Sequence, residues 1–375
     1  MEGDSPAPFE AVGGHRLSIF YGEKTRDGLS TIRKTTTAWE IMYYLAMELA
    51  KEDTLAQLPT SAQPDADGAR GKFIHAAGKL ANFTPALFSI RFPEKYVSKS
   101  TALRPYMEHV DEWIVLEAGS PARSVVLALL FNELFDGAEQ LKSFDADYDT
   151  ATWGIGLIDE TSGMQKPCVM DIKVGFIRHS PLTPKDKIER MVKKERDSLM
   201  RNTALRICGL RRYVRASTGT EGVTDTLQCE RYGKAIGYAM SDVCELSSCL
   251  KMFLSIGEPI AEIKQDGLLV VRSKMMGAAT ATERTHMEQR VSQVRAELKL
   301  LIDFFEGTPD GAFLLQHMAF VSTSLLLLYD AGASPATARL RFIDFARSTW
   351  RRFNFGESTV GFVQGLKNLD AYISL

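Results

Sequence analysis

The chain has 375 residues, 45% of them hydrophobic and 25% charged, and a formal net charge of −2. This length allows a large buried core and predicts two domains or lobes. The near-neutral charge predicts no nucleic-acid partner, so an anionic ligand needs a local cluster of basic side chains. No apolar run reaches the roughly 20 residues that span a bilayer, and we expect no membrane insertion.

Residues 1–15 are acidic and proline-rich and carry no recognisable secretory signal. The five cysteines have no CxxC spacing, which is typical of reduced thiols in an intracellular protein. The histidines show no HxxxH or HExxH pattern, so we expect no transition-metal centre built by the protein alone. These features predict a cytoplasmic or nuclear protein. Protein partners and oligomeric state stay open.

The first half of the chain combines short strands with helices. Strands are predicted at residues 13–20, 29–36, 111–119 and 153–163, and helices at 38–50 and 122–141. In the first helix, an apolar face is predicted from residues that repeat every three or four positions: Trp39, Met42, Tyr43, Ala46 and Leu49. Residues 57–71 are polar, contain prolines and predict a flexible loop.

The second half is mostly helical. A strand at 167–175 precedes helices at 183–201, 230–253, 281–306 and 312–320, strands at 321–330 and 338–346, and a last helix at 360–375. The helix at 183–201 has Thr183 as its expected N-cap and Pro184 at its first position. Because strands and helices do not alternate regularly, we predict an α+β protein of two lobes, 1–161 and 162–375, with a cleft between them.

The stretch KPCVMDIKVGFIRHSP at residues 166–181 places Asp171 and Lys173 two positions apart in an apolar strand. Side chains two apart on a strand point to the same face. The two residues form either a structural ion pair or a catalytic pair at the edge of a cleft.

Two further charged residues, Asp344 and Lys34, also have a structural and a functional interpretation. Asp344 stands between Ile343 and Phe345, where a carboxylate is costly unless it is paired or binds a cation such as Mg²⁺. A structural capping aspartate is the alternative for Asp344.

Lys34 ends a predicted strand and Glu40 opens the next helix, an arrangement that orients phosphate-binding lysines in kinase-like lobes. An ordinary exposed lysine is the alternative for Lys34.

The helix at 183–201 carries a basic stripe beside an apolar one. The basic residues are Lys187, Arg190, Lys194 and Arg201. They form either a solvated face with i,i+4 ion pairs, such as Asp186–Arg190, or a site for a polyanion. Lys187 has no acidic residue three or four positions away, which favours the polyanion site.

Taken in order, these segments resemble the inositol polyphosphate kinase family. PCVMDIKVG at 167–175 matches its PxxxDxKxG signature, TSLLLLYD at 323–330 resembles its SSLL element, and FIDFA at 342–346 resembles its metal-binding IDF motif. GFVQGLKNL at 361–369 resembles the closing GxxxGLxxL helix, and ALRICGLRRY at 204–213 the GFRIxGMxxY segment. GGH at 13–15 and EIMYY at 40–44 stand where the family has its GH and ExxFY elements.

Two departures from the family pattern bear on the site. Arg347 stands where the family usually has a histidine, which leaves substrate contacts at this position open. The hinge between the lobes reads Leu157-Ile158-Asp159-Glu160 instead of LEDL or LENL. WIVLEAG around Glu117 is a second candidate hinge, but it would require a large insertion before Pro167. We therefore prefer a hinge near 157–161.

The resemblance implies a protein-kinase-like fold, ATP and Mg²⁺ as cofactors, and transfer of a phosphoryl group to a soluble inositol polyphosphate. Lys34 would bind the α- and β-phosphates of ATP, with Glu40 holding it. Main-chain groups near Asp159 and Glu160 would meet the adenine.

On the acceptor side, Asp171 would accept the proton of the attacking hydroxyl, and Lys173 would stabilise charge on the transferred group. Asp344 would bind Mg²⁺, with Ser324 beside it. The phosphates already on the inositol ring would be held by Lys187, Arg190 and Lys194, with Arg347 as an addition.

Within the family, MDIKVG and TPKDKIERM resemble the multikinase branch, which phosphorylates inositol tris- and tetrakisphosphates. The RHS at 178–180 resembles the hexakisphosphate kinases, which form pyrophosphates, and that branch is the alternative. A non-catalytic scaffold that binds inositol phosphates is a further hypothesis, although none of the assigned catalytic residues is missing. A protein kinase is not supported, because no HRDxxxxN or DFG string occurs.

Overall fold

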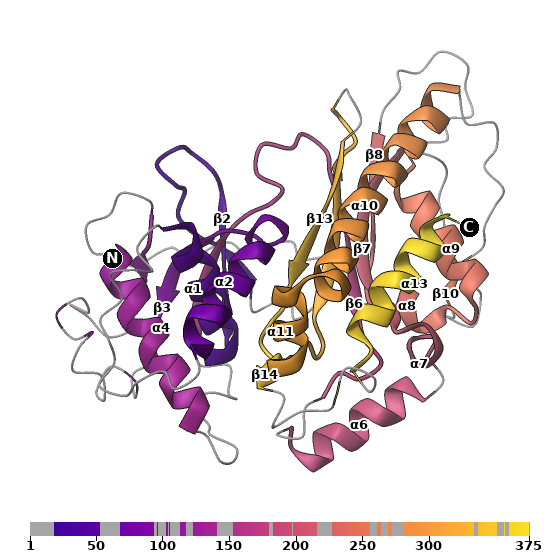
Figure 1. Ribbon diagram of the computed structural model, residues 1–375. Coiled ribbons are helices and arrows are strands. Elements are labelled where there is room, and N and C mark those ends of the chain that lie inside the picture. Colours follow the sequence, from indigo (N-terminus) through magenta and orange to yellow (C-terminus); the bar gives the residue numbers. More distant parts are fainter. Residues whose placement is uncertain are drawn as a thin grey trace.

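The protein is α+β, with one five-stranded antiparallel sheet in each of two lobes (Figure 1). This computed structural model describes the following residues: 19–52, 68–93, 96, 103, 105, 113–117, 123–140, 153–179, 183–196, 198–215, 227–255, 261–263, 269–271, 281–333, 337–350, 356 and 360–374. The GGH motif therefore lies outside the described residues, as does most of the predicted loop at 57–71.

The first lobe contains a sheet of order β1-β2-β5-β3-β4 and its covering helices. The strands are β1 (Ile19–Tyr21), β2 (Thr31–Thr36), β3 (Leu87–Arg91), β4 (Ile114–Val115) and β5 (Trp153–Ile158). The helices are α1 (Ala38–Lys51), α2 (Ala69–Leu80), the short 3₁₀ helix η3 (Ala81–Phe83) and α4 (Arg123–Gln140). Helix α1 is buried from Ala38 to Leu49, on all of its faces, because α2 and α4 also pack against it.

The second lobe contains a sheet of order β13-β12-β6-β7-β8. Its strands are β6 (Pro167–Val174), β7 (Leu205–Arg215), β8 (Leu227–Tyr232), β12 (Ser324–Asp330) and β13 (Ala338–Ile343). Two small sheets pair β9 (Ala261–Ile263) with β10 (Leu269–Val271), and β11 (Met318–Ala319) with β14 (Thr349–Trp350).

Helices of the second lobe flank this sheet, and α8, α10 and α13 pack against it (Figure 1). They are α6 (Lys185–Glu195), α7 (Met200–Thr203), α8 (Ala235–Ala239), α9 (Val243–Phe253), α10 (Ala281–Gly307), α11 (Pro309–His317) and α13 (Phe362–Ser374). None of the helices within the described ranges is both long and apolar enough to cross a membrane.

Strand β6 is the central strand of the second sheet, between β12 and β7. Lys173 lies opposite Ser324 of β12 and Arg206 of β7, and directly paired residues of neighbouring strands share a face. Gly175, directly after the strand, has a φ of +105°, a conformation that favours glycine, and a side chain there would meet the carbonyl of Val360. The sheet therefore brings three polar side chains into one row at the end of β6.

The predicted helix at 183–201 is wrong in its extent. Helix α6 covers Lys185–Glu195, and Pro184, not Thr183, is its N-cap residue. The helix stops because the backbone N–H and the hydroxyl of Ser198 both donate to the Glu195 carbonyl, each at 3.0 Å. The short helix α7 then begins as a separate element.

The helix predicted at 230–253 is wrong as one continuous helix, because the span contains the end of β8, the short helix α8 (Ala235–Ala239) and then α9. Residues up to Tyr232 extend β8, which pairs with β7. Helix α9 begins only after Asp242, whose carboxylate accepts a hydrogen bond from the N–H of Glu245 at 2.8 Å. The helix predicted at 312–320 is α11, which begins at Pro309 after the capping residue Thr308.

Strands β3 and β7 and helix α2 were not predicted, and α2 includes residues 69–71 of the expected loop.

Candidate active site

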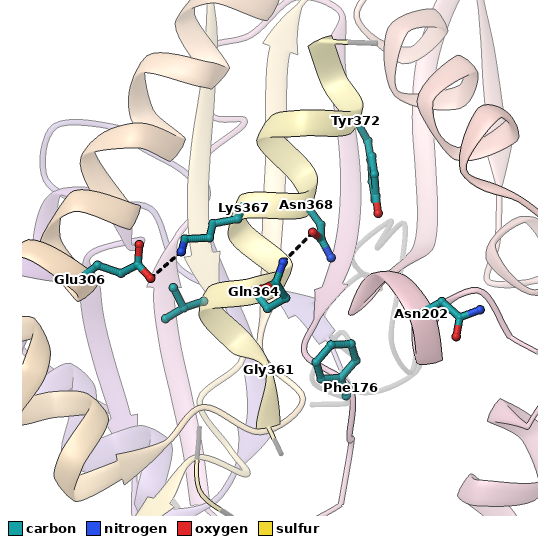
Figure 2. A pocket seen from close by; sticks show the side chains of 9 residues that line it. Phe176, Asn202, Glu306, Gly361, Gln364, Lys367, Asn368 and Tyr372 are labelled. Atoms are coloured by element: carbon teal, nitrogen blue, oxygen red, sulfur yellow. Dashed lines mark hydrogen bonds and ion pairs between the residues drawn. The ribbon is translucent and has the colours of Figure 1, made fainter. Parts of the chain in front are cut away.

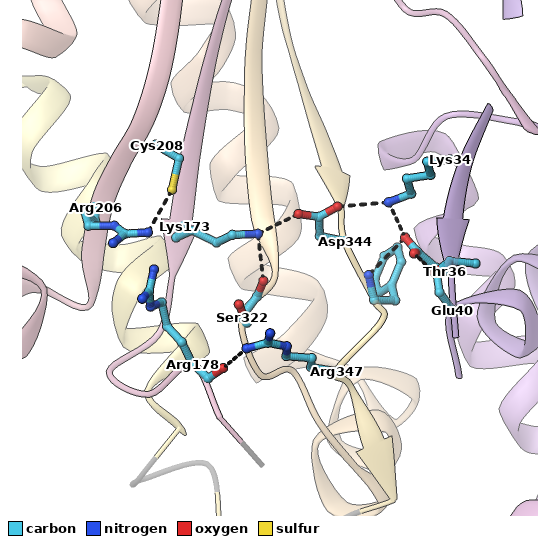
Figure 3. A network of polar contacts seen from close by, with 11 residues as sticks. Lys34, Thr36, Glu40, Lys173, Arg178, Arg206, Cys208, Ser322, Asp344 and Arg347 are labelled. Atoms are coloured by element: carbon cyan, nitrogen blue, oxygen red, sulfur yellow. Dashed lines mark hydrogen bonds and ion pairs between the residues drawn. The ribbon is translucent and has the colours of Figure 1, made fainter. Parts of the chain in front are cut away.

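One carboxylate joins the two lobes at the centre of the site. Asp344, directly after β13, accepts a hydrogen bond from Nζ of Lys34 at 2.9 Å through Oδ1 and from Nζ of Lys173 at 2.6 Å through Oδ2 (Figure 3). Lys173 also donates to the carbonyl of Ser322 at 2.9 Å. Strand β2 of the first lobe and strand β6 of the second thus direct their lysines at the same residue.

Glu40 holds Lys34 from the other side. Its Oε1 accepts from Nζ of Lys34 at 2.9 Å, so the ion pair expected from the sequence is present. Glu40 itself is buried, and its Oε2 accepts from the hydroxyl of Thr36. The side chain of Lys34 is only 14% exposed, so the alternative of an ordinary surface lysine does not describe it.

The charges of this cluster stabilise one another. Burial alone would lower the pKa of Lys34, but the carboxylates of Glu40 and Asp344 raise it well above its ordinary value. Burial likewise opposes the charge of Lys173, yet Asp344 and Asp171 raise its pKa. Burial would raise the pKa of Asp344, but Lys173 and Lys34 hold it far below the ordinary range. All three groups are therefore charged at neutral pH.

Asp171 lies in a different environment from Asp344. It is buried, and its Oδ1 has no hydrogen-bond partner among the described residues. Burial raises its pKa, Lys173 opposes that shift, and the negative charge of Asp344 adds to it. A carboxylate with a raised pKa and a free acceptor oxygen is suited to taking a proton from a hydroxyl group.

The end of β13 offers a ligand for a divalent cation. The side chain of Asp344 is 36% exposed although both oxygens are hydrogen-bonded. No group of three or more His, Cys, Asp or Glu side chains within the described residues could hold a metal ion. A single ionised carboxylate fits Mg²⁺, which commonly takes one or two protein carboxylates and completes its shell with phosphate oxygens and water.

Ser324 is the neighbour that sequence reasoning placed beside the metal ligand. It begins β12, opposite Ile343 on one side and Lys173 on the other. Its hydroxyl is buried and lies beside the carboxylate of Asp171, whose pKa it lowers. The residue is next to the site, and a direct role in binding metal or nucleotide stays a prediction.

The preferred hinge follows β5 and contacts both lobes. Asp159 caps the turn, since its Oδ1 accepts from the N–H of Thr161 at 2.9 Å. The carboxylate of Glu160 accepts from Nε of Arg341, on β13, at 2.8 Å. The side chain of Glu160 is therefore used in an ion pair between the lobes, and adenine binding by the main chain stays a prediction.

The described part of the second candidate hinge, residues 113–117, lies within the first lobe. Glu117 follows β4, and its carboxylate pairs with Arg26 at 3.0 Å and accepts from the backbone N–H of the same residue at 2.6 Å. The chain enters the second lobe between β5 and β6, which favours the hinge near 157–161.

The basic residues of α6 do not form one site. Arg190 pairs with Asp186 at 2.8 Å, and both side chains are more than 70% exposed, as expected for a solvated face. Lys187 is exposed and has no ion pair in the described residues. The side chain of Lys194 lies outside the described residues.

Arg347 connects α6 with the end of β13. Its guanidinium donates to the carbonyl of Arg178 at 2.6 Å (Figure 3). It also lies 3.8 Å from Sδ of Met191 on α6. Burial and the charge of Arg178 lower the pKa of Arg347. Burial, and then the charges of Arg347 and Arg190, lower the pKa of Lys187. The pKa shifts of Lys187 and Arg347 indicate that the positive charges in this region are not fully balanced by nearby carboxylates.

Arg206 belongs to the same region and was missed in the sequence. It is 4% exposed, and its Nε and one terminal nitrogen have no hydrogen-bond partner among the described residues. Its other contacts are Sγ of Cys208 at 3.2 Å and the ring of Tyr238, whose centroid is 4.5 Å away. Recognition of β7 as the strand beside β6 would have placed Arg206 opposite Lys173. Burial opposes the charge of Arg206, but Cys208, Tyr238 and Glu195 raise its pKa. Its two nitrogens left unpaired within the described part of the chain can donate to a bound anion.

A cavity of about 560 Å³ lies elsewhere on the second lobe (Figure 2). It runs along α13 and is lined by Phe176, Asn202, Glu306, Gly361, Val363, Gln364, Lys367, Asn368 and Tyr372. None of the charged residues around Asp344 lines it, so this cavity is separate from the candidate active site.

Residues 154–374, more than half of the chain, match the family model described as inositol polyphosphate kinase. Inositol hexakisphosphate kinase 1 of Rattus norvegicus is 27% identical over 221 residues, which are 54% of this chain and 47% of that protein. The chain thus spans about half the length of this curated relative.

Two solved structures also resemble the chain. One is described as structural studies and protein engineering of inositol phosphate multikinase (19% identity, TM-score 0.40, 58% of this chain and 83% of that chain). The other is inositol phosphate multikinase Ipk2 from S. cerevisiae in complex with ADP and Mn²⁺ (16% identity, TM-score 0.41, 59% and 83%). With TM-scores of 0.40 and 0.41, these two structural similarities carry no argument, so the family assignment depends on the match to the family model. That match over residues 154–374 shows that the chain belongs to the inositol polyphosphate kinase family.

Proposed function

We propose that the protein is an ATP-dependent kinase that phosphorylates a free hydroxyl of a soluble inositol tris- or tetrakisphosphate. The observation that carries this proposal is the arrangement around Asp344, which holds Lys34 and Lys173 while Asp171 lies two positions from Lys173 on β6. Phosphoryl transfer requires mainly positioning and charge stabilisation, and these residues supply both.

On the acceptor side, Asp171 hydrogen-bonds the attacking hydroxyl and accepts its proton. Its raised pKa supports this role, because a base is most effective when its pKa approaches the working pH. Lys173, on the same strand, stays protonated and stabilises the negative charge of the group being transferred.

On the nucleotide side, Lys34 exchanges its contact with Asp344 for the α- and β-phosphates, and Glu40 keeps it oriented. The adenine binds main-chain groups near Asp159 and Glu160. Asp344 is the residue that would hold Mg²⁺. When bound there, Mg²⁺ neutralises charge on the β- and γ-phosphates.

The phosphates already on the ring bind basic side chains whose positive charge is not fully balanced by nearby carboxylates. Burial and the charges of Arg347 and Arg190 lower the pKa of Lys187, and a bound anion would relieve that repulsion. Arg206 offers two unsatisfied N–H donors beside Lys173. Lys194 is a further proposed contact, whereas the ion pair with Asp186 makes Arg190 the weakest member of the predicted set.

A hexakisphosphate kinase that forms a pyrophosphate is the second candidate. It is favoured by the curated relative, which is named as an inositol hexakisphosphate kinase. Against it stands Asp171, since a fully phosphorylated ring offers this buried carboxylate no hydroxyl donor and only phosphate oxygens of like charge.

The two candidates are separated by a competition experiment. The protein is incubated with ATP, Mg²⁺ and equal concentrations of inositol tris-, tetrakis- and hexakisphosphate, and the products are resolved by anion exchange. We expect a higher kcat/KM for a tris- or tetrakisphosphate. A higher value for the hexakisphosphate, with a pyrophosphate product, would favour the second candidate and leave the family assignment unchanged.

A further inference from the structure

The aromatic ring that follows Asp344 is enclosed by two rings of the other lobe. Phe345 is fully buried and stacks on Tyr43 of α1, with ring centroids 5.0 Å apart and ring planes at 22°. It meets Tyr44 edge-on at 5.7 Å and 79°. Within its own lobe it contacts Phe342 at 4.7 Å. Phe345 therefore lies in a hydrophobic core that both lobes share.

Two hydrogen bonds cross between the lobes at the same place. The backbone N–H of Phe345 donates to Oε1 of Glu40 at 3.3 Å, the oxygen that also accepts from Lys34. The hydroxyl of Thr37, the N-cap residue of α1, donates to the carbonyl of Ala346 at 2.9 Å. The backbone after Asp344 is thus fixed to the first turn of α1.

Asp344 itself has a backbone conformation that needs such support. Its φ is +65°, in the left-handed region that residues with a side chain seldom adopt. Conformations of this kind persist where the surrounding structure determines them, and they concentrate at functional sites. The neighbours that determine it are the two lysines on its carboxylate and the buried ring one position later.

We propose that Phe345, together with Tyr43 and Tyr44, is a positioning clasp that fixes Asp344 relative to Lys34. The clasp holds the backbone of both lobes while Lys34 moves from the carboxylate to the nucleotide, so Lys34 and Asp344 are already in place when the phosphates and the cation bind. The consequence for catalysis rests on the proposed function. The structural consequence, a fixed segment after β13, does not.

The rings and not the hydroxyls make this contact. The hydroxyls of Tyr43 and Tyr44 are buried and have no hydrogen-bond partner among the described residues. Tyr43→Phe keeps the stacked ring, whereas Tyr43→Leu and Phe345→Leu remove one side of the stack. Phe253→Leu is a matched control, because Phe253 is equally buried in the second lobe and meets the ring of Tyr329 edge-on at 5.3 Å and 71°, away from α1.

The test uses two readouts that need no inositol phosphate. The first is hydrogen exchange of backbone amides in residues 343–348 of the full chain. The second is the affinity for Mn²⁺ in the presence of ADP, measured by calorimetry. Residues that support metal ligands typically alter metal affinity by about 10- to 100-fold, and we expect a loss of this size, with faster exchange, in Tyr43→Leu and Phe345→Leu.

Tyr43→Phe is expected to behave like the wild type in both readouts. Phe253→Leu is expected to lower the melting temperature as much as the clasp variants do. It should change neither the amide exchange at residues 343–348 nor the affinity for Mn²⁺. The proposal is overturned if the clasp variants and Phe253→Leu give the same exchange at 343–348. If exchange changes as expected but the wild type phosphorylates no inositol phosphate, the clasp stands and only the proposed function fails.

Discussion

Lys34 and Asp344 are hydrogen-bonded at 2.9 Å although 310 positions of sequence separate them. The contact places the phosphate-binding lysine proposed for one lobe on the metal ligand proposed for the other. The same carboxylate also holds Lys173 at 2.6 Å. A nucleotide brings negative charge that can replace the carboxylate at Lys34, so the ion pair keeps the lysine in place for the phosphates.

Asp344→Asn is expected to stay folded and to bind nucleotide, but to lose nearly all turnover. The amide cannot serve as an anionic metal ligand and leaves two lysines without their shared carboxylate. Breaking a buried pair costs about 3–5 kcal/mol of unfolding free energy. We expect a smaller loss, because the Asp344 side chain is 36% exposed and solvent screens the charge.

The variant is assessed by circular dichroism, by ATP binding and by product formation across a Mg²⁺ titration. Turnover near the wild-type level, with ordinary Mg²⁺ dependence in a folded protein, would remove Asp344 from the metal site.

Asp171→Asn is expected to be almost inactive and, at neutral pH, more stable than the wild type. Loss of a general base typically costs about 10²- to 10⁴-fold in rate. Because burial raises the pKa of Asp171, folding carries an electrostatic penalty while the carboxyl is ionised. That penalty is complete above the folded-state pKa and is absent below the ordinary value of 3.8, where both states are protonated.

The measurement is the melting temperature of both proteins from pH 8 down to pH 4. The advantage of Asp171→Asn should decrease as the pH falls through this interval. A variant that is less stable than the wild type at pH 8 would show that Asp171 is a structural ion-pair partner of Lys173.

Lys187→Ala and Lys194→Ala are expected to raise the KM for the inositol phosphate about tenfold each, with little change in the KM for ATP. A hydrogen bond to a charged group contributes about 1.5–3 kcal/mol, which sets this scale. Arg190→Ala on the same helix is the control, because Arg190 is already paired with Asp186. Equal effects of all three substitutions on the KM for the inositol phosphate would indicate a general loss of positive potential and no specific contact.

Arg206→Met is expected to raise the KM for the inositol phosphate by at least about tenfold while the free energy of unfolding is kept or increased. The reason is that Arg206 is buried with Nε and one terminal nitrogen unpaired among the described residues, so an apolar side chain of similar volume removes their desolvation cost. That gain offsets the lost hydrogen bond to Cys208 and the lost attraction to Glu195. Chemical denaturation and steady-state kinetics of the same preparation check both parts. A destabilised variant with an unchanged KM would make Arg206 a structural residue.

The local parts of the site could be predicted from the sequence, because they depend on short-range pattern. Alternation along β6 placed Asp171 and Lys173 together, and the six-residue step from Lys34 to Glu40 follows from a strand that turns into a helix. The late strand β12 was recognisable as an apolar run, and β13 followed it after a short turn.

The long-range parts could not be predicted in this way. Strand β7 contains buried arginines, so its sequence LRICGLRRYVR shows no clean alternation of apolar and polar residues. Unless β7 is recognised as a strand, nothing in the sequence indicates that Arg206 lies beside Lys173. The contact of Phe345 with Tyr43 depends on how two lobes pack, and periodicity within one segment says nothing about it.

The most direct test of the proposed reaction is transfer of labelled γ-phosphate from ATP to inositol trisphosphate in the presence of Mg²⁺, with products resolved by anion exchange. The wild type should yield labelled tetrakis- or higher phosphates. Asp171→Asn, folded and still able to bind ATP, should reduce the rate by about 10²- to 10⁴-fold. Labelled product formed equally fast by both proteins, or no labelled inositol phosphate from the wild type, would contradict the proposed function.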